Sequence, residues 1–400
     1  MGVWMVVVFS RAVLPALRLW ARAKNRELDL LPRPTDAPQV HAKGADADRI
    51  LVFGSGPAVG WGVTSHDLAL PGQLARALAA RTGRGVDVDV ITDSALTIKA
   101  AIPRLAKLKL WRYEAVVLSL GIGDAMDATD RTTWRRELTA TIDFVLSNAS
   151  RDTSVFIAGI QPLRSVRAYD SVFGGFAERQ IKRLNAMNEE ICAQFDRAYF
   201  VPVATPLTSG ATRGATIYRH WAEELAAAMH EPFEENRIDF VPDPVSPTAE
   251  AERQAAVDSL GILDTPADER FDRIVALARD VYGTEVAVFS VIDRDREWHK
   301  STVGTDIDEL ARSSSFCSHT IRARGAMVVP DLRLDERFEH NPFVEGEPHF
   351  RFYAGFPVES PSGERIGALC VLDSSPRDSA DVDESTLREL ALRIQAELRP

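Results

Sequence analysis

The sequence predicts an α/β protein of two domains: a three-layer domain on a parallel sheet, then an α+β domain on an antiparallel sheet. Three observations lead to this prediction. Strand-like apolar runs alternate with helical patterns from Arg49 to Met229, which is typical of a parallel sheet covered by helices on both faces. Four prolines lie among polar residues between His230 and Pro247, which indicates a linker. After Thr248, two helical stretches precede a series of turn-linked strands.

Hydrophobic periodicity gives the expected elements. In the first domain we expect strands at 50–53, 86–91, 115–120, 154–160 and 198–203, with amphipathic helices between them. In the second domain we expect helices at 249–260, 268–282 and 384–398, and strands at 285–292, 298–303, 327–329, 351–359 and 365–372. The resulting boundaries are an N-terminal segment and linker at 1–48, a first domain at 49–229, a linker at 230–247 and a second domain at 248–400.

Charge and cysteine content exclude several classes of protein. The formal net charge is -11 at pH 7, whereas a nucleic-acid binder needs a surplus of Lys and Arg on some face. The three cysteines, Cys192, Cys317 and Cys370, lie far apart in the sequence and form no Cys-x-x-Cys pair, so neither a disulfide framework nor a zinc site is indicated. We therefore predict a cytoplasmic protein with no nucleic-acid partner, no metal and no cofactor.

The N-terminal 26 residues combine an apolar run with a cationic face. The run from Val3 to Phe9 is almost wholly apolar, and five Lys or Arg residues follow before the first acid, Glu27. A secretory signal carries its charge before the apolar run, whereas here the charges follow it. A spanning helix needs about 20 apolar residues, so Arg11 and Pro15 disfavour it. We expect either a peripheral helix that lies on a membrane surface or a helix that packs on its own domain.

The loop from Phe53 to Val63 is rich in glycine and lies between a predicted strand and a predicted helix. In such a turn, small residues bring backbone N–H groups close to a ligand. The stretch Phe-Gly-Ser-Gly-Pro-Ala-Val-Gly-Trp-Gly-Val resembles the first block of the SGNH (GDSL-type) hydrolases, where Phe-Gly-Asp-Ser is followed, after three residues, by Gly-Trp-Gly-Val. Aligned without gaps, Ser55 falls on the aspartate and Gly56 on the nucleophilic serine. The resemblance implies a flavodoxin-like arrangement of the first domain.

Other blocks of that family carry the remaining catalytic groups. Residues 216–223 resemble the helix start that follows the family's Asp-x-x-His pair, and counting back puts Ser209 at the aspartate and Thr212 at the histidine. In Gly-Ile-Gly-Asp, Gly123 stands where the family has an asparagine that donates to the oxyanion. Neither Ser209 nor Thr212 can act as a general base at neutral pH. The resemblance therefore implies a degenerate site without hydrolytic activity.

A rearranged hydrolytic site is the alternative. Ser55 would be the nucleophile, and His66 or His220 would be the base beside Asp124. Each of these residues also has an ordinary structural role, since a lone helical histidine is usually a packing or surface residue and a serine in this loop is a common turn residue.

Several segments of the second domain resemble GAF domains of bacterial sensory proteins. They are 260–266, 315–321, 331–357 and 367–373, in that order. The resemblance implies a six-stranded sheet with a pocket that binds a small molecule, or a surface for dimerisation. Phe316, Cys317, His319 and Tyr353 are the residues expected near that pocket, although the two aromatic residues and the cysteine are equally suited to a core.

These observations predict a sensory or regulatory protein, a pseudoenzyme joined to a GAF domain. Because the sequence ends soon after the last predicted helix, its signal is expected to pass to a partner, through a homodimer, or into the first domain. The alternative is a GAF-regulated esterase or lipase of the SGNH type. A scaffold whose domains only make protein contacts is a third hypothesis.

Overall fold

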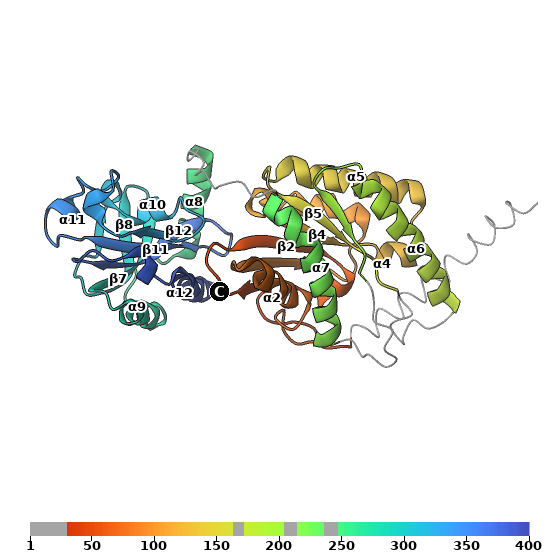
Figure 1. Ribbon diagram of the computed structural model, residues 1–400, viewed down its shortest axis with the longest axis horizontal. Coiled ribbons are helices and arrows are strands. Elements are labelled where there is room, and N and C mark those ends of the chain that lie inside the picture. Colours follow the sequence, from red (N-terminus) through yellow and green to blue (C-terminus); the bar gives the residue numbers. More distant parts are fainter. Residues whose placement is uncertain (1–29, 163–171, 204–213, 236–246, 400) are drawn as a thin grey trace, which may run out of the picture. The chain divides into compact units, whose positions relative to one another are not determined.

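The computed structural model describes residues 30–162, 172–203, 214–235 and 247–399 (Figure 1). The chain separates into two compact units, each of which is built on its own sheet. The predicted membrane-surface segment at 1–26 lies outside the described residues. Among the described residues, no helix combines the length and the apolar character needed to cross a membrane.

The first unit contains the predicted parallel sheet. Its strand order is β1-β3-β2-β4-β5-β6, and β2 to β6 pair in parallel. The strands are β1 (Gln39–Ala42), β2 (Asp48–Gly54), β3 (Val86–Thr92), β4 (Ala115–Ser119), β5 (Ser154–Ala158) and β6 (Ala198–Val201). Strands β4 and β5 are buried along their whole length, as expected for a sheet covered on both faces.

Helices cover both faces of this sheet, so the unit has three layers. One core contains apolar side chains of α2 (Leu70–Thr82) and α7 (Ala215–Glu235), and the core on the other face contains those of α3 (Ala101–Leu105), α4 (Ile122–Met126), α5 (Arg131–Asn148) and α6 (Val172–Cys192). Figure 1 shows α2 and α7 on the side of the sheet opposite α5 and α6. The α/β prediction is therefore confirmed.

Two elements of this unit differ from the expected segments. Strand β1 pairs antiparallel with β3 inside the segment expected to be a linker at 1–48. Helix α7 continues to Glu235, beyond the expected linker start at His230, with Pro232 inside the helix. The side chain of Phe233 is buried in the core of α2 and α7, which explains why the helix runs past the proline.

The second unit is an antiparallel sheet of order β10-β11-β12-β7-β8-β9, as the α+β prediction requires. Its strands are β7 (Val286–Asp293), β8 (Arg296–Val303), β9 (Glu309–Ala311), β10 (Met327–Val329), β11 (Phe352–Glu359) and β12 (Arg365–Asp373). Apolar residues of α8 (Pro247–Leu260), α9 (Glu269–Tyr282) and α12 (Glu384–Glu397) form the core on one face. The other face is covered by the short helices α10 (Cys317–Thr320) and α11 (Pro342–Glu345) and their loops.

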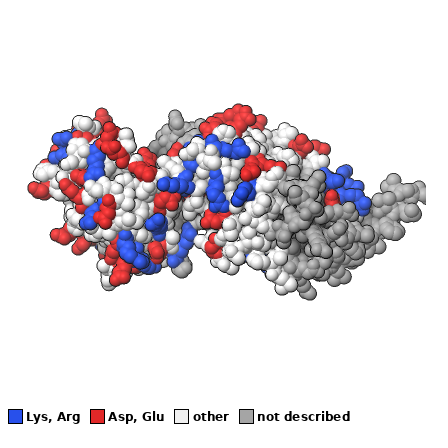
Figure 2. Space-filling model, turned by 60° about the horizontal axis from the view of Figure 1, so that its bottom comes forward, with Lys and Arg blue, Asp and Glu red and all other residues white. Residues whose placement is uncertain are grey.

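Figure 2 shows how charged side chains are distributed on one face of the molecule. On the face shown in Figure 2, Lys and Arg side chains are interspersed with Asp and Glu rather than gathered in one field.

Candidate functional sites

The first candidate site lies where the strand order of the parallel sheet reverses, at the carboxyl ends of β2 and β4. Such switch points are where ligands of open α/β sheets bind. The two strand ends are tied together, since Ser55 N donates to Ser119 O over 2.7 Å and Ser119 Oγ donates to Ser55 O over 3.0 Å. A Cβ atom on Gly54 would lie 2.0 Å from Ser119 O. Only glycine allows this close approach.

Gly56 opens the short 3₁₀ turn Gly56–Val59 that follows Ser55. Its φ angle is +63°, a left-handed conformation that is unfavourable for residues with a side chain. A Cβ atom built here would lie 2.8 Å from Cδ1 of Ile122. The apolar Ile122 side chain therefore occupies the space into which a side chain at position 56 would project.

Within the described part of the chain, the Ser55 hydroxyl is not bonded to any histidine or carboxylate. Ser55 Oγ is buried and has no hydrogen-bond partner there. His66 is held by Asp36, whose Oδ1 lies 2.7 Å from His66 Nδ1 and also accepts from the His66 N–H. His220 lies on α7 with its Nε2 3.5 Å from Glu224 Oε1, and 38% of its side chain is exposed.

Asp124, on α4, is the ionisable residue of this region most strongly affected by its surroundings. Only 1% of the residue is exposed. Its carboxylate accepts hydrogen bonds from Ile98 N and Thr129 Oγ1 over 3.0 and 3.1 Å. Burial outweighs these bonds and raises the pKa of Asp124 to about 6. The contacts assign Asp124 to holding two loops, while Ser209 and Thr212 lie outside the described residues.

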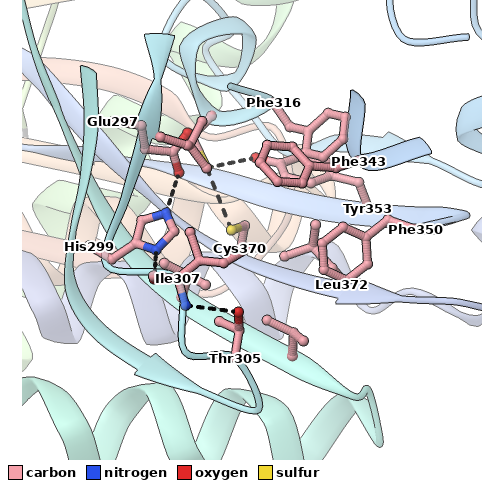
Figure 3. A pocket seen from close by; sticks show the side chains of 14 residues that line it. Glu297, His299, Thr305, Ile307, Phe316, Phe343, Phe350, Tyr353, Cys370 and Leu372 are labelled. Atoms are coloured by element: carbon pink, nitrogen blue, oxygen red, sulfur yellow. Dashed lines mark hydrogen bonds and ion pairs between the residues drawn. The ribbon is translucent and has the colours of Figure 1, made fainter. Parts of the chain in front are cut away.

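The second candidate site is a cavity of about 40 Å³ between the sheet of the second unit and the layer of α10 and α11 (Figure 3). Its inner wall consists of buried apolar and aromatic side chains. Thr305, Ile307, Leu310 and Phe343 are partly exposed and close its outer side. The complete lining is Val286, Val288, Glu297, His299, Thr305, Ile307, Leu310, Phe316, Cys317, Phe343, Phe350, Tyr353, Cys370 and Leu372.

Glu297 and His299 form a buried pair on the wall of this cavity. Both side chains are at most 5% exposed, and Glu297 Oε1 lies 3.2 Å from His299 Nε2 (Figure 3). They face the same side because they are two residues apart on β8, before a bulge at Lys300 shifts the register. Trp298, between them, packs in the opposite core.

The partner of the second histidine nitrogen fixes the protonation of the pair. His299 Nδ1 lies 2.6 Å from the carbonyl oxygen of Ile307, which can only accept, so Nδ1 carries a proton. The contact between Nε2 and Glu297 then requires a second proton, held between the two side chains. Whichever atom holds that proton, the pair as a whole has no net charge.

Hydrogen bonds to Glu297 favour its ionised form. Burial alone raises the pKa of this carboxyl, but the hydrogen bond and charge of His299, with hydrogen bonds from Ser315 and Cys317, shift the pKa below its usual value. Glu297 and His299 are thus held together as a buried pair without net charge.

Sulfur and phenol groups complete the polar part of the wall. Cys317 Sγ lies 3.5 Å from Cys370 Sγ, and Tyr353 donates its O–H to Cys317 Sγ over 3.4 Å. Tyr353 Oη also lies 2.6 Å from Thr320 Oγ1. Burial raises the pKa values of the Cys317 thiol and the Tyr353 phenol, so both stay protonated. A thiol in that state is a poor nucleophile and a poor metal ligand.

Three of the four residues expected near this pocket, Phe316, Cys317 and Tyr353, line the cavity. His319 does not, because its ring packs edge-on against Phe338 at a centroid distance of 4.9 Å. Sequence reasoning missed Glu297 and His299. The one available signal was their spacing: Glu297 and His299 are two residues apart on a strand, so both side chains face the same side of the sheet. Within the described ranges, no three His, Cys, Asp or Glu side chains are grouped to hold a metal ion.

Comparisons with known proteins agree with this division of the chain. Residues 52–242 match the GDSL-like Lipase/Acylhydrolase family, and residues 266–398 match the GAF domain. A cyclic di-GMP phosphodiesterase of Pseudomonas aeruginosa is 41% identical over 156 residues, which make up 39% of this chain and 27% of that protein. The chain thus spans little more than a quarter of the length of that relative.

Two solved structures are also among those similar to parts of this chain. A family 3 carbohydrate esterase of Clostridium thermocellum has a TM-score of 0.38 and 16% identity, covering 48% of this chain and 98% of its own. The GAF domain of an Acinetobacter phosphoenolpyruvate-protein phosphotransferase has a TM-score of 0.27 and 16% identity, covering 38% of this chain and 94% of its own.

Proposed function

Because the chain joins a GDSL-like domain to a GAF domain, we propose that it is a sensory protein. Its GAF cavity binds a small uncharged ligand, and its GDSL-like domain does not hydrolyse esters. The observation that carries the proposal is the net-neutral Glu297–His299 pair on the wall of an otherwise mostly apolar cavity. The likeness to a cyclic di-GMP phosphodiesterase supports a role in signalling.

The size of the cavity limits the ligand. A water molecule needs about 10–15 Å³ of such volume, so a cavity of about 40 Å³ holds a molecule of roughly three or four non-hydrogen atoms. A ligand of that size gains at most about 1.5 kcal/mol per atom, so its Kd is no lower than about 40 μM. Larger ligands require the partly exposed Phe343 to move outward.

The Glu297–His299 pair determines the charge of the ligand. Burying an uncompensated charge costs several kcal/mol, and a cation or an anion could be compensated only by separating Glu297 from His299. An uncharged ligand with one hydroxyl or carbonyl group avoids that cost, because it can bond to either partner while the pair stays closed.

The absence of ester hydrolysis rests on the first unit. The left-handed backbone at Gly56 and the contact of a side chain there with Ile122 Cδ1 disfavour a nucleophile at this position. Among the residues that the structure describes, Ser55 Oγ has no base within hydrogen-bond distance. The ligand signal is then passed to a partner protein or to a second copy of the chain.

Ligand charge can be tested with three small molecules that have the same number of non-hydrogen atoms and differ in charge. Binding of 2-propanol, isopropylammonium and acetate to the full chain is followed through the ¹³C-methyl resonances of Val286, Val288, Ile307 and Leu310. We expect saturable shifts with 2-propanol alone, at millimolar concentration. Stronger binding of either ion would contradict the proposed ligand class.

One matched pair of variants assigns the shifts to the cavity. Val288→Ile adds a methylene group at the cavity wall, whereas Val291→Ile adds it on the same strand in the opposite core. Only Val288→Ile should abolish the 2-propanol shifts. Equal effects of the two variants would place the binding elsewhere.

A further inference from the structure

The helices α5 and α6 of the first unit form a second, basic groove, distinct from the switch point and from the GAF cavity. The groove has a volume of about 670 Å³ and is lined by Arg131, Thr132, Arg135, Arg136, Lys182, Arg183, Ala186, Met187 and Glu190. Five of these nine residues are cationic and one is anionic, in a protein whose formal net charge is -11. The local charge is thus opposite to that of the whole molecule.

The groove has a fixed frame. Trp134 Nε1 of α5 donates to Asn188 Oδ1 of α6 over 2.8 Å, and neither residue is exposed. Met187, which is 6% exposed, and Ala186 contribute apolar surface between the charged walls. The buried hydrogen bond holds the two helices, and therefore their cationic side chains, at a set spacing.

Most of the positive charge in the groove is not neutralised by the protein. Arg131, Lys182 and Arg183 have no ion-pair partner among the described residues. Arg135 Nη2 lies 2.6 Å from Glu190 Oε2, and Arg136 Nη2 lies 2.6 Å from Glu137 Oε1. Arg135 and Glu190 are each about half exposed, and exposed pairs of this kind contribute little stability, so an incoming anion can displace them.

We propose that this groove binds a small ligand through two adjacent phosphate groups. Guanidinium groups bind phosphate through paired, charge-assisted hydrogen bonds, and four of the five cations are arginines. A diphosphate carries about three negative charges at neutral pH, which matches the three unpaired cations. The volume lies in the range of small-molecule sites, roughly 300–1,000 Å³, so a compact anion fits better than an extended polymer.

Calorimetric titration of the full chain with inorganic pyrophosphate tests this proposal. Lys182→Ala/Arg183→Ala should weaken pyrophosphate binding by at least about tenfold, because two unpaired donors are lost. The matched control is Arg81→Ala/Lys107→Ala, which removes the same charge from exposed sites of the same unit outside the groove. It should change the Kd by less than about twofold. Equal weakening in both double variants would overturn the proposal.

A blocking variant and further ligands complete the test. Ala186→Glu places an acid between the two walls and should abolish binding, with near-ultraviolet circular dichroism of Trp134 and the other aromatic residues reporting an intact fold. Adenosine diphosphate separates a nucleotide source from free pyrophosphate. Vesicles that contain an isoprenyl diphosphate test a lipid source. Tighter binding of the nucleotide or vesicles would identify the source of the phosphate. Equal competition by sulfate, or no saturable binding of any of these ligands, would overturn the proposal.

Discussion

Gly56 is the residue that the sequence alignment predicts to lie at the position of the family's serine. In the structure its backbone is left-handed, and Ile122 lies where a side chain would be. The sequence alone did not indicate this conformation. Only the structure shows that a simple glycine-to-serine change would strain the loop.

Gly56→Ala should destabilise the protein for two reasons. The left-handed conformation costs about 1–2 kcal/mol for an alanine, and the contact with Ile122 Cδ1 at 2.8 Å adds to that cost. Gly83→Ala is the matched control, because Gly83 has a φ angle of +72° and nothing within 4 Å of the added Cβ. Urea unfolding should show a larger loss for Gly56→Ala. Equal losses would mean that Ile122 does not restrict this position.

Asp124 should make the stability of the first unit depend on pH. Its folded-state pKa of about 6 lies above the ordinary value of 3.8, so between these values the folded protein binds more protons than the unfolded chain. The contribution of Asp124 to the free energy of unfolding is therefore greatest at low pH, and it is lost as the pH rises through about 6. Asp124→Asn should gain up to about 3 kcal/mol relative to wild type over this interval, measured by urea unfolding at a series of pH values.

Asp130 provides a control of opposite sign. It caps α5 by accepting from Thr133 N and Thr133 Oγ1, and these hydrogen bonds lower its pKa. The ionised Asp130 carboxylate stabilises the folded protein above its ordinary pKa, and this stabilisation disappears as the pH falls. As the pH rises, Asp130→Asn should therefore become less stable relative to wild type. If the stability difference from wild type changes with pH in the same direction for Asp124→Asn and Asp130→Asn, burial does not determine the pKa of Asp124.

The two residues that define the GAF cavity chemically could not be predicted from spacing alone. Phe316, Cys317 and Tyr353 lie in segments that resemble a known domain, whereas Glu297 stood just before the expected strand at 298–303. The observed strand begins at Arg296. Its pairing partners and the bulge decide which side chains face inward, and both depend on contacts distant in the sequence.

At the level of helices and strands, the long periodic segments were predicted well, and so were the short edge strands β6 and β10, but the edge strands β1 and β9 were missed. The central strands β2 and β4 are continuous apolar runs and agree with the expected ranges. Strands β1 and β9 have four and three residues and lie at sheet edges, so they carry little periodicity of their own. Their formation depends on the neighbouring strand that they pair with.

One buried hydrogen bond joins α5 and α6. Asn188→Leu removes the acceptor of Trp134 Nε1–H in a fully buried site, which should cost about 1–2 kcal/mol. The expected cost is small for a buried hydrogen bond because Asn188 Nδ2 has no hydrogen-bond partner among the described residues, so its removal also relieves an unsatisfied buried donor. Urea unfolding of Asn188→Leu and of Trp134→Phe/Asn188→Leu checks this. The double variant should recover part of the loss, and strict additivity would contradict the assigned bond.

For the whole molecule, the sequence predicted two domains and both sheet types because each unit has a separate apolar core on each face of its sheet. A sheet needs that burial whatever its ligand, so the pattern is strong. The chemical properties of the two candidate sites depend on a few local details. These are the φ angle of Gly56, the burial of Ser55 Oγ, and the proton between Glu297 and His299. None of these leaves a periodic signal in the sequence.

The most direct test of a sensor without hydrolase activity is the hydrolysis of 4-nitrophenyl acetate by the full chain and by Ser55→Ala. In subtilisin, loss of the catalytic serine lowers kcat by about 10⁶-fold. We predict equal, background rates for the two proteins. Wild-type turnover that disappears in Ser55→Ala would contradict the proposed function.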